Sequence, residues 1–290
     1  MKNYRLFFAI NLIAVVFTSC KNGDEEPVNN QTHILGHRGS GVSNQSDFQE
    51  NTYESVLNAF DKLDGAEVDI QCSKNGTLWL FHNADLPENS QGLLCLPQST
   101  DNQIHQLNTE NPAFTITNLE EIFLLMMEME NRPFLSLDIK GYFNNGCFEN
   151  TEQLHAYFDM MADGLNKLLA KYPLHKQIMI ETDYQYFLDL IVNQQPDVET
   201  YLLGYNDFEK RIQIALEKAY DGISFNVKDE DLSKNDIKKA HDNRLKVQLW
   251  TVYSEDDFEK VMQWSPDFVQ TGSVELGEQF IDYQDSQRRN

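Results

Sequence analysis

Short apolar runs separated by turn-forming residues recur along most of this chain. Each run is rich in Val, Ile, Leu, Phe or Tyr and is too short for a complete helix, so it predicts a buried strand. Eight runs fit this description: residues 33–37, 66–71, 134–140, 177–182, 200–205, 222–226, 246–252 and 267–271.

Segments with helical period lie between most of these strands. Thr52 can cap a helix with Val56, Leu57 and Phe60 on its apolar face, and residues 117–120 resemble the capping box of another helix. Further helices are expected at residues 154–172, 184–192, 208–220, 231–241 and 256–264. This alternation predicts an α/β protein with a (β/α)8 TIM barrel, and a doubly wound open sheet is the structural alternative. No Gly-x-Gly-x-x-Gly motif follows the first strand, which disfavours a dinucleotide-binding sheet.

One connection departs from the strand–helix alternation. Residues 73–76 (Ser-Lys-Asn-Gly) are a strong turn signal after the second strand, so the chain is expected to fold back as a hairpin. The hairpin would bring His82 near Glu67 and Asp69. Residues 84–116 then lack convincing periodicity, and we expect them to form an irregular insertion, which is more often functional than a simple linker.

The N-terminal residues are typical of an export signal rather than of the barrel. Lys2 and Arg5 precede an apolar stretch at residues 6–17 that is too short to span a bilayer as a stable helix. Small residues then precede Cys20, an order that resembles a bacterial lipobox, although an ordinary secretory peptide is the alternative. The expected division is a lipoprotein signal peptide at residues 1–19, a flexible tether at 20–31 and the barrel domain at 32–290.

The net charge and the cysteines indicate which partners and which cellular compartment to expect. The net charge is −23, and removal of the two cations of the signal would make it −25 (−23 − 2). Such acidity disfavours binding to nucleic acid or to an anionic membrane surface, so we expect membrane contact only through the lipid anchor of an exported protein, on the periplasmic or outer-membrane face of a bacterial cell membrane. Export permits a disulfide, for which Cys95 and Cys147 are the expected pair, with Cys72 buried. The cysteine spacing matches no zinc site.

Four short segments of the first half carry the chemistry. They are residues 36–39 (Gly-His-Arg-Gly), 50–52 (Glu-Asn-Thr), 67–69 (Glu-Val-Asp) and 81–83 (Phe-His-Asn). Together they combine two histidines, an arginine and several carboxylates on expected strand ends and loops. This combination indicates an acid/base pair, a phosphate-binding cation and a site for a divalent metal ion.

These segments resemble the glycerophosphodiester phosphodiesterase (GDPD) family, and the resemblance continues along the chain. Residues 135–140 (Leu-Ser-Leu-Asp-Ile-Lys) and 250–253 (Trp-Thr-Val-Tyr) extend it in order and at suitable spacing. The resemblance implies a barrel enzyme that hydrolyses a glycerophosphodiester to a glycerol phosphate and an alcohol. Its partner would be a small phosphodiester, the deacylated head group of a phospholipid, and its cofactor a divalent cation.

Glu67, Asp69 and Asp138 are the expected metal ligands. Glu67 and Asp69 stand two positions apart on one strand and therefore point to the same face. Asp138, on the next barrel strand, would complete the set. Oxygen ligands alone favour Mg²⁺ or Ca²⁺ over zinc. An exposed polar edge is the alternative, but Val68 and Ile70 indicate that the opposite face is buried.

His37 and His82 are the expected general acid and base, because imidazole can both accept and donate a proton near neutral pH. Arg38 and Lys140 are expected to bind the phosphate. Glu50 is expected to assist substrate binding or to pair with Arg38; the alternative is that it simply precedes the helix cap. The alternatives for Trp250 are a wall of the alcohol pocket and plain core. The five remaining histidines are expected to be structural: His33, His105, His155, His175 and His241.

The chain departs from the family pattern around the rim of the expected pocket. Asp138 stands where the family usually carries Glu, Asn83 where it carries Asp, and Tyr253 where it carries Asn; residues 270–273 lack the usual Thr-Asp-x-Pro. These changes affect the substrate more than the reaction. Two other functions therefore stay open. One is an enzyme of the same barrel acting on another diester, as a phospholipase D-like lyase or a phosphatidylinositol-type phospholipase C. The other is a non-catalytic lipoprotein that binds head groups.

Overall fold

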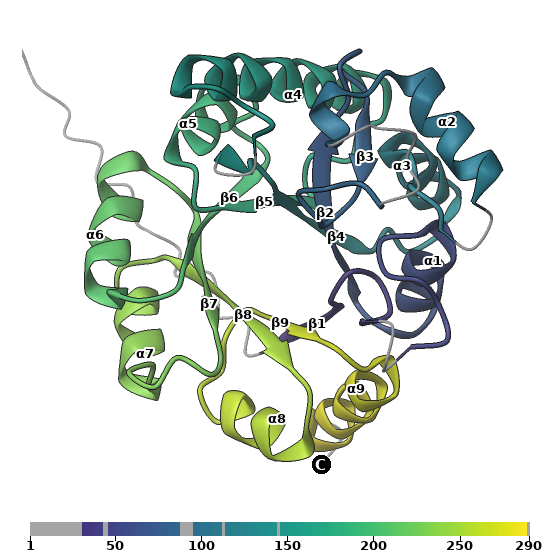
Figure 1. Ribbon diagram of the computed structural model, residues 1–290. Helices are drawn as coiled ribbons and strands as arrows, with labels where there is room; N and C mark the ends of the chain where they lie inside the picture. Colours follow the sequence, from purple (N-terminus) through teal and green to yellow (C-terminus); the bar gives the residue numbers. More distant parts are fainter. Residues whose placement is uncertain (1–30, 43–45, 88–94, 112–113, 144–145, 289–290) are drawn as a thin grey trace, which may run out of the picture. The chain divides into compact units, whose positions relative to one another are not determined.

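A closed parallel barrel forms the body of the protein in the computed structural model, which describes residues 31–42, 46–87, 95–111, 114–143 and 146–288 (Figure 1). The strands are β1 (His33–Gly36), β2 (Gly65–Cys72), β3 (Leu78–Leu80), β4 (Phe134–Ile139), β5 (Ile178–Thr182), β6 (Glu199–Gly204), β7 (Gly222–Asn226), β8 (Lys246–Val252) and β9 (Phe268–Thr271). Their order is β1-β9-β8-β7-β6-β5-β4-β2-β3, and β1 also pairs with β2. This last pairing closes the barrel, so the open-sheet alternative is wrong.

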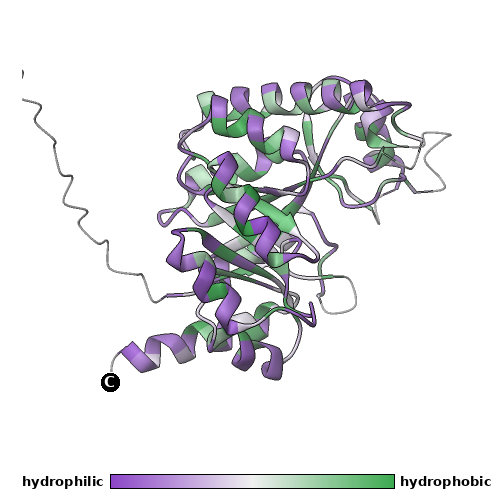
Figure 2. Ribbon diagram, turned by 90° about the vertical axis from the view of Figure 1, so that its left-hand side faces the viewer, coloured by the Kyte–Doolittle hydropathy of each residue, from purple (hydrophilic) through white to green (hydrophobic). Residues whose placement is uncertain are grey.

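Helices surround the barrel and cover its outer face (Figure 1). They are α1 (Tyr53–Lys62), α2 (Asp101–Glu110), α3 (Leu119–Glu128), α4 (Thr151–Lys171), α5 (Gln185–Gln194), α6 (Phe208–Lys218), α7 (Lys234–Asp242), α8 (Glu255–Met262) and α9 (Val274–Arg288). Their outward faces are mostly hydrophilic (Figure 2). None of the helices in the described ranges is long and apolar enough to cross a membrane.

The N-termini of the helices follow from local side-chain chemistry. Thr52 caps α1 as predicted, accepting a hydrogen bond from the backbone N–H of Ser55, whose side chain in turn accepts from the N–H of Thr52. The capping box predicted at residues 117–120 is wrong. Asn118 caps α3 by accepting from the N–H of Glu120, while the Thr117 hydroxyl accepts from the backbone of Tyr53.

The hairpin after the second strand forms as predicted. β3 runs antiparallel to β2, with Cys72 opposite Leu78 and Ile70 opposite Leu80. The insertion is not wholly irregular, however, because it contains a short 3₁₀ helix, η1 (Leu96–Gln98), and the ten-residue helix α2. Ile104 and Leu107 are the buried residues of α2, and two apolar residues are too few to produce a clear helical period.

A disulfide joins the insertion to the loop that follows β4. Cys95 and Cys147 form this bond with their Cα atoms 6.0 Å apart, which confirms the predicted pair. Cys72 is free and buried, also as predicted. Burial, reinforced by the nearby Asp101 carboxylate, raises the pKa of the Cys72 thiol to about 12, so this cysteine stays protonated and unreactive at neutral pH.

The interior of the barrel changes character along its axis. Leu35, Met179, Tyr201 and Phe268 form a buried apolar cluster, with Phe134 packed against it. Beyond this cluster the buried inward residues, Leu203 apart, are polar: Glu67, Ser136, Glu181, Ser224, Gln248 and Gln270. Barrel interiors are usually filled with branched apolar side chains, and active sites lie at the carboxyl ends of the strands. The polar layer therefore marks the functional end of this barrel.

Candidate active site

A cavity at the carboxyl ends of the strands brings together most of the residues singled out in the sequence. Its volume is about 100 Å³. The lining includes both expected histidines, both cations and all three expected metal ligands: His37, His82, Arg38, Lys140, Glu67, Asp69 and Asp138. These residues come from β2, β4 and the segments that follow β1, β3 and β4, so closure of the barrel is what makes them neighbours.

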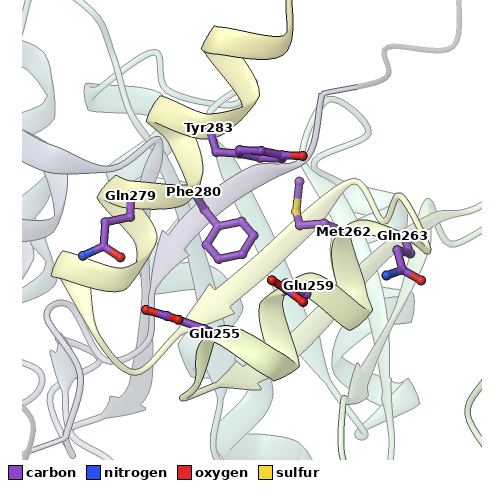
Figure 3. Close-up of a pocket in the computed structure, with 7 residues that line it drawn as sticks. All are labelled: Glu255, Glu259, Met262, Gln263, Gln279, Phe280 and Tyr283. Carbon is purple, nitrogen blue, oxygen red and sulfur yellow. The ribbon is translucent and has the colours of Figure 1, made fainter.

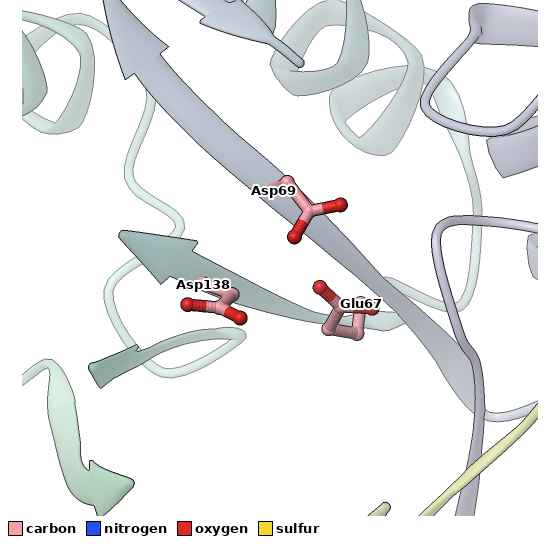
Figure 4. Close-up of side chains that lie close together, drawn as sticks. All are labelled: Glu67, Asp69 and Asp138. Carbon is pink, nitrogen blue, oxygen red and sulfur yellow. The ribbon is translucent and has the colours of Figure 1, made fainter. Parts of the chain in front are cut away.

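The three carboxylates converge on one point. Glu67 and Asp69 lie on β2, and Asp138 on β4 is the direct register partner of Asp69. One oxygen from each carboxylate lies within 4.8 Å of the others (Figure 4). The side chains of Glu67 and Asp69 are each 2% exposed, and that of Asp138 is 15% exposed. A buried set of oxygen donors of this kind fits a hard divalent cation such as Mg²⁺ or Ca²⁺.

Arg38 and Lys140 supply positive charge beside this cluster. Lys140 Nζ lies 2.9 Å from Asp69 Oδ1 and 2.5 Å from Asp138 Oδ2. Arg38 Nε lies 3.3 Å from Asp69 Oδ2, and its Nη1 donates to Glu50 Oε1 at 2.9 Å. Glu50 thus forms an ion pair with Arg38, and it does not itself line the cavity.

Asn51 fixes the position of Asp69, a role that the sequence did not reveal. Its side-chain amide donates to Asp69 Oδ2 at 2.8 Å and accepts from the Asp69 backbone N–H at 2.9 Å. Asn51 has a φ of 58°, a left-handed conformation that asparagine adopts more readily than most residues. The Glu-Asn-Thr segment thus combines an orienting carboxylate, an amide clamp and a helix cap.

Burial and neighbouring charges set the ionisation of the carboxylates in different directions. Burial opposes the charge on Asp69, but Lys140 and Arg38 outweigh it and hold the pKa of Asp69 well below its usual range. Burial and the charge of Asp69 raise the pKa of Glu67 well above its ordinary value. Burial also raises the pKa of Asp138 to about 6, despite the opposing charge of Lys140. Repulsion between neighbouring carboxylates disfavours ionisation of all three at once, and a bound cation would offset this repulsion.

The two candidate acid/base residues face the same cavity from different segments. His37 Nε2 lies 3.8 Å from Glu67 Oε2, and its side chain is 13% exposed. Burial, together with the charges of Arg38 and Lys140, lowers the pKa of His37 to about 3. His37 is therefore neutral at physiological pH.

His82 is held in place through its backbone. The side-chain amide of Gln71 donates to the carbonyl oxygens on either side of it, at 3.0 Å to Phe81 and 2.7 Å to Asn83. The Tyr142 hydroxyl donates to the carbonyl of His82 itself. The His82 ring contacts Asn83, with Nδ1 3.0 Å from Asn83 Oδ1. Sequence reasoning missed the roles of Gln71 and Tyr142, although Gln71 continues the inward alternation of Glu67 and Asp69.

Further residues line the cavity on the side of β5, β6 and β8. Trp250 lines the cavity, and Tyr205 packs against it edge-to-face at 5.6 Å between ring centroids. Glu181 of β5 also faces the cavity. The available signal for Glu181 was its place at the carboxyl end of an expected strand. None of the five histidines expected to be structural lines this cavity.

Two other hollows on the described part of the chain lack this combination. A groove of about 530 Å³ lies between α8 and α9, with Met262, Phe280 and Tyr283 beside Glu255 and Glu259 (Figure 3). A second hollow of about 320 Å³ lies beside α6 and contains several acidic side chains. Neither lining contains a histidine or an arginine, so neither offers the acid/base and phosphate-binding groups found at the barrel mouth.

The fold is similar to that of solved phosphodiesterases. A glycerophosphodiester phosphodiesterase from Thermotoga maritima shares 19% identity at a TM-score of 0.64, with 87% of this chain and 98% of that chain covered. One from Parabacteroides distasonis shares 15% at 0.68, with coverage of 88% and 98%. An Oleispira antarctica phosphodiesterase, solved with the product sn-glycerol-3-phosphate, shares 17% at 0.68, with coverage of 86% and 96%. No curated protein matches the chain.

The family assignment rests on a match that covers most of the chain. Residues 37–276 match the model of the Glycerophosphoryl diester phosphodiesterase family. The matched region begins at His37 and contains every residue described above at the barrel mouth. The chain is thus an enzyme that belongs to the glycerophosphodiester phosphodiesterase family.

Proposed function

We propose that this enzyme hydrolyses a glycerophosphodiester to a glycerol phosphate and an alcohol, with a divalent cation bound by Glu67, Asp69 and Asp138. The observation that carries the proposal is the convergence of these three carboxylates beside two histidines and two cations in one cavity. The Oleispira antarctica phosphodiesterase, which was solved with sn-glycerol-3-phosphate, supports the class of product.

In this proposal the two histidines move the protons. His37 accepts a proton from the attacking oxygen, which belongs to water or to a neighbouring hydroxyl of the substrate. His82 gives a proton to the alcohol oxygen as its bond to phosphorus breaks. When water attacks, one P–O bond forms and one breaks. A hydroxyl of the substrate would first form a cyclic phosphate, which water then opens. The bound cation would stabilise negative charge on the phosphoryl oxygens.

Arg38 and Lys140 bind the phosphate in the same scheme. Both cations flank the carboxylate cluster, and the Arg38 fork can meet two phosphate oxygens at once. Glu50 keeps the guanidinium in position through its hydrogen bond to Nη1. Trp250 and Tyr205 form the wall against which we place the alcohol.

A substrate panel tests the proposed reaction. We expect purified enzyme to release glycerol phosphate from at least one of glycerophosphocholine, glycerophosphoinositol and glycerophosphoglycerol, assayed with Mg²⁺ and with Ca²⁺ separately. Intact lysolipids are the comparison substrates. Products identified by mass spectrometry distinguish the alternatives. A cyclic phosphate as the final product would indicate a lyase, and action on lysolipids alone would indicate a phospholipase.

We also propose that the enzyme is exported and anchored through a lipid on Cys20. The supporting features are the cations and apolar stretch before Cys20, and the Cys95–Cys147 disulfide, which is typical of an oxidising compartment. The expected signal peptide lies outside the described residues, as does the tether apart from Gln31. We expect Cys20→Ser to move the protein from the membrane fraction to the soluble fraction of its bacterial host. An unchanged distribution would contradict the lipid anchor.

A further inference from the structure

Glu181 is a carboxylate enclosed within the barrel, where it is 1% exposed. Its Oε1 accepts hydrogen bonds from the Ser136 hydroxyl at 3.1 Å and from the Gln270 amide at 2.6 Å. Its Oε2 accepts from the Ser224 hydroxyl at 2.7 Å. Three donors from β4, β7 and β9 thus hold the carboxylate in one orientation.

All three of these partners are neutral. Within the described ranges of the chain Glu181 has no ion pair. Burying a carboxylate without a cation is costly, and neutral hydrogen bonds compensate for only part of the lost hydration. A cation that binds at the neighbouring carboxylates would supply the countercharge that Glu181 lacks.

Glu181 lies directly beside the proposed metal ligands. On adjacent strands it is the register partner of Asp138, and it lines the same cavity as Glu67 and Asp69. It is not one of the three residues whose oxygens lie within 4.8 Å of one another. It is therefore placed to act on a bound cation from the neighbouring position while keeping its own hydrogen bonds.

The charges of the cavity lining support this arrangement. The lining contains four carboxylates, from Glu67, Asp69, Asp138 and Glu181, and two permanent cations, from Arg38 and Lys140. With all four carboxylates ionised, the formal sum is −2 (−4 + 2), which one divalent cation neutralises. Glu50, which pairs with Arg38 from outside the lining, adds a further negative charge, and every ionised carboxylate of the site, Glu181 included, favours a bound dication.

We propose that Glu181 determines how tightly the site holds its divalent cation, acting through its charge rather than as one of the three converging ligands. This inference rests on the proposed function, since it assumes the cation site at Glu67, Asp69 and Asp138. Replacing a residue that surrounds the ligands of a metal site without binding the metal typically changes the metal affinity by about 10- to 100-fold. We expect an effect of that size.

Calorimetric titration of metal-free protein with MgCl₂ and with CaCl₂ tests the proposal without any activity assay. Glu181→Gln should weaken binding by about 10- to 100-fold. The substitution keeps the shape: the amide oxygen can still accept from Gln270 and Ser136, and the Ser224 hydroxyl can accept from the new amide nitrogen. Glu199→Gln is the matched control, because Glu199 begins β6 at the other end of the barrel, where it pairs with Lys246. We expect it to leave cation affinity unchanged.

Two further measurements separate charge from packing. Glu181→Asp keeps the charge and should keep the cation affinity within a few-fold of wild type. Thermal unfolding should show that Glu181→Gln is at least as stable as wild type without cation, because a buried unpaired charge is gone, and gains less from added Mg²⁺ or Ca²⁺. Glu181→Asp also serves if Glu181→Gln does not fold, because loss of binding by folded Glu181→Asp would contradict a role for charge.

The outcomes for this inference and for the proposed function are distinct. If wild type binds neither cation, the metal site of the proposed function is wrong, and this inference is wrong with it. If wild type binds a cation and folded Glu181→Gln binds it equally tightly, the metal site stands and only the role of Glu181 is refuted.

Discussion

Replacing His82 with alanine should lower kcat for a glycerophosphodiester by about 10²- to 10⁴-fold, the usual contribution of one positioned proton transfer. His82 lines the cavity that holds the carboxylate cluster, and Gln71 and Tyr142 fix its backbone there. An alkoxide leaves slowly unless it is protonated, so loss of the proton donor should slow P–O cleavage. Steady-state kinetics on a glycerophosphodiester measure the effect.

The leaving group separates the two histidines. A nitrophenyl ester of glycerol phosphate releases a stable phenolate that needs no proton, so His82→Ala should lose much less activity on this substrate. His37→Ala should lose activity on both substrates, because the attacking oxygen still has to give up its proton. His105→Ala is the matched control, since His105 is exposed on α2 and packs against Trp79 outside the cavity. Equal losses of His82→Ala on the two substrates would contradict its role as proton donor.

Removal of divalent cations should strongly reduce the rate of hydrolysis. A bound dication stabilises the charge on a transferring phosphoryl group by several kcal/mol, which corresponds to at least about 10²-fold in rate. Activity measured in excess EDTA should therefore fall by that factor and return on addition of Mg²⁺ or Ca²⁺. Undiminished activity in EDTA, after dialysis against the chelator, would contradict the metal site.

The substitution Asp69→Asn tests the metal site by changing one of its proposed ligands. Asp69→Asn removes the negative charge of one of the three converging carboxylates. It also removes the ion pairs that Asp69 forms with Lys140 and Arg38. We expect it to lose cation binding and activity together. Asp101→Asn is the comparison, because Asp101 is a hydrogen-bonded carboxylate on the far side of the hairpin, where it accepts from Ser73 and Thr77. This control should keep wild-type cation affinity.

The segments of secondary structure were largely predictable from local pattern. All eight barrel strands and the hairpin follow from short apolar runs and one turn signal, since burial on both faces leaves few polar residues in a strand. The helix at residues 101–110 was missed because it buries only Ile104 and Leu107. Its capping box, in which Thr100 and Gln103 satisfy each other's backbone N–H groups, was the available signal.

The candidate site likewise contains residues that a local motif reveals and contacts that no local motif reveals. The His-Arg-Gly, Glu-Asn-Thr and Glu-x-Asp segments could be found in the sequence because each holds its chemistry within a few residues. The contacts of Glu181 could not, because Ser136, Ser224 and Gln270 lie 45, 43 and 89 residues away from it. No local pattern relates positions that are so far apart.

The sequence by itself indicated the alternating strands and helices and the short motifs of the candidate site, because periodicity and motifs act over neighbouring residues, and it left the barrel and the open sheet as alternatives. Only the tertiary structure decided which charged and hydrogen-bonding side chains lie next to one another. The pairing of β2 with β4 places Lys140 between two carboxylates, the pairing of β4 with β5 sets Glu181 beside Asp138, and Asn51 clamps Asp69 from the segment before α1. The physical reason is that electrostatic interactions depend on distance and burial in three dimensions, and neither is a property of position along the chain.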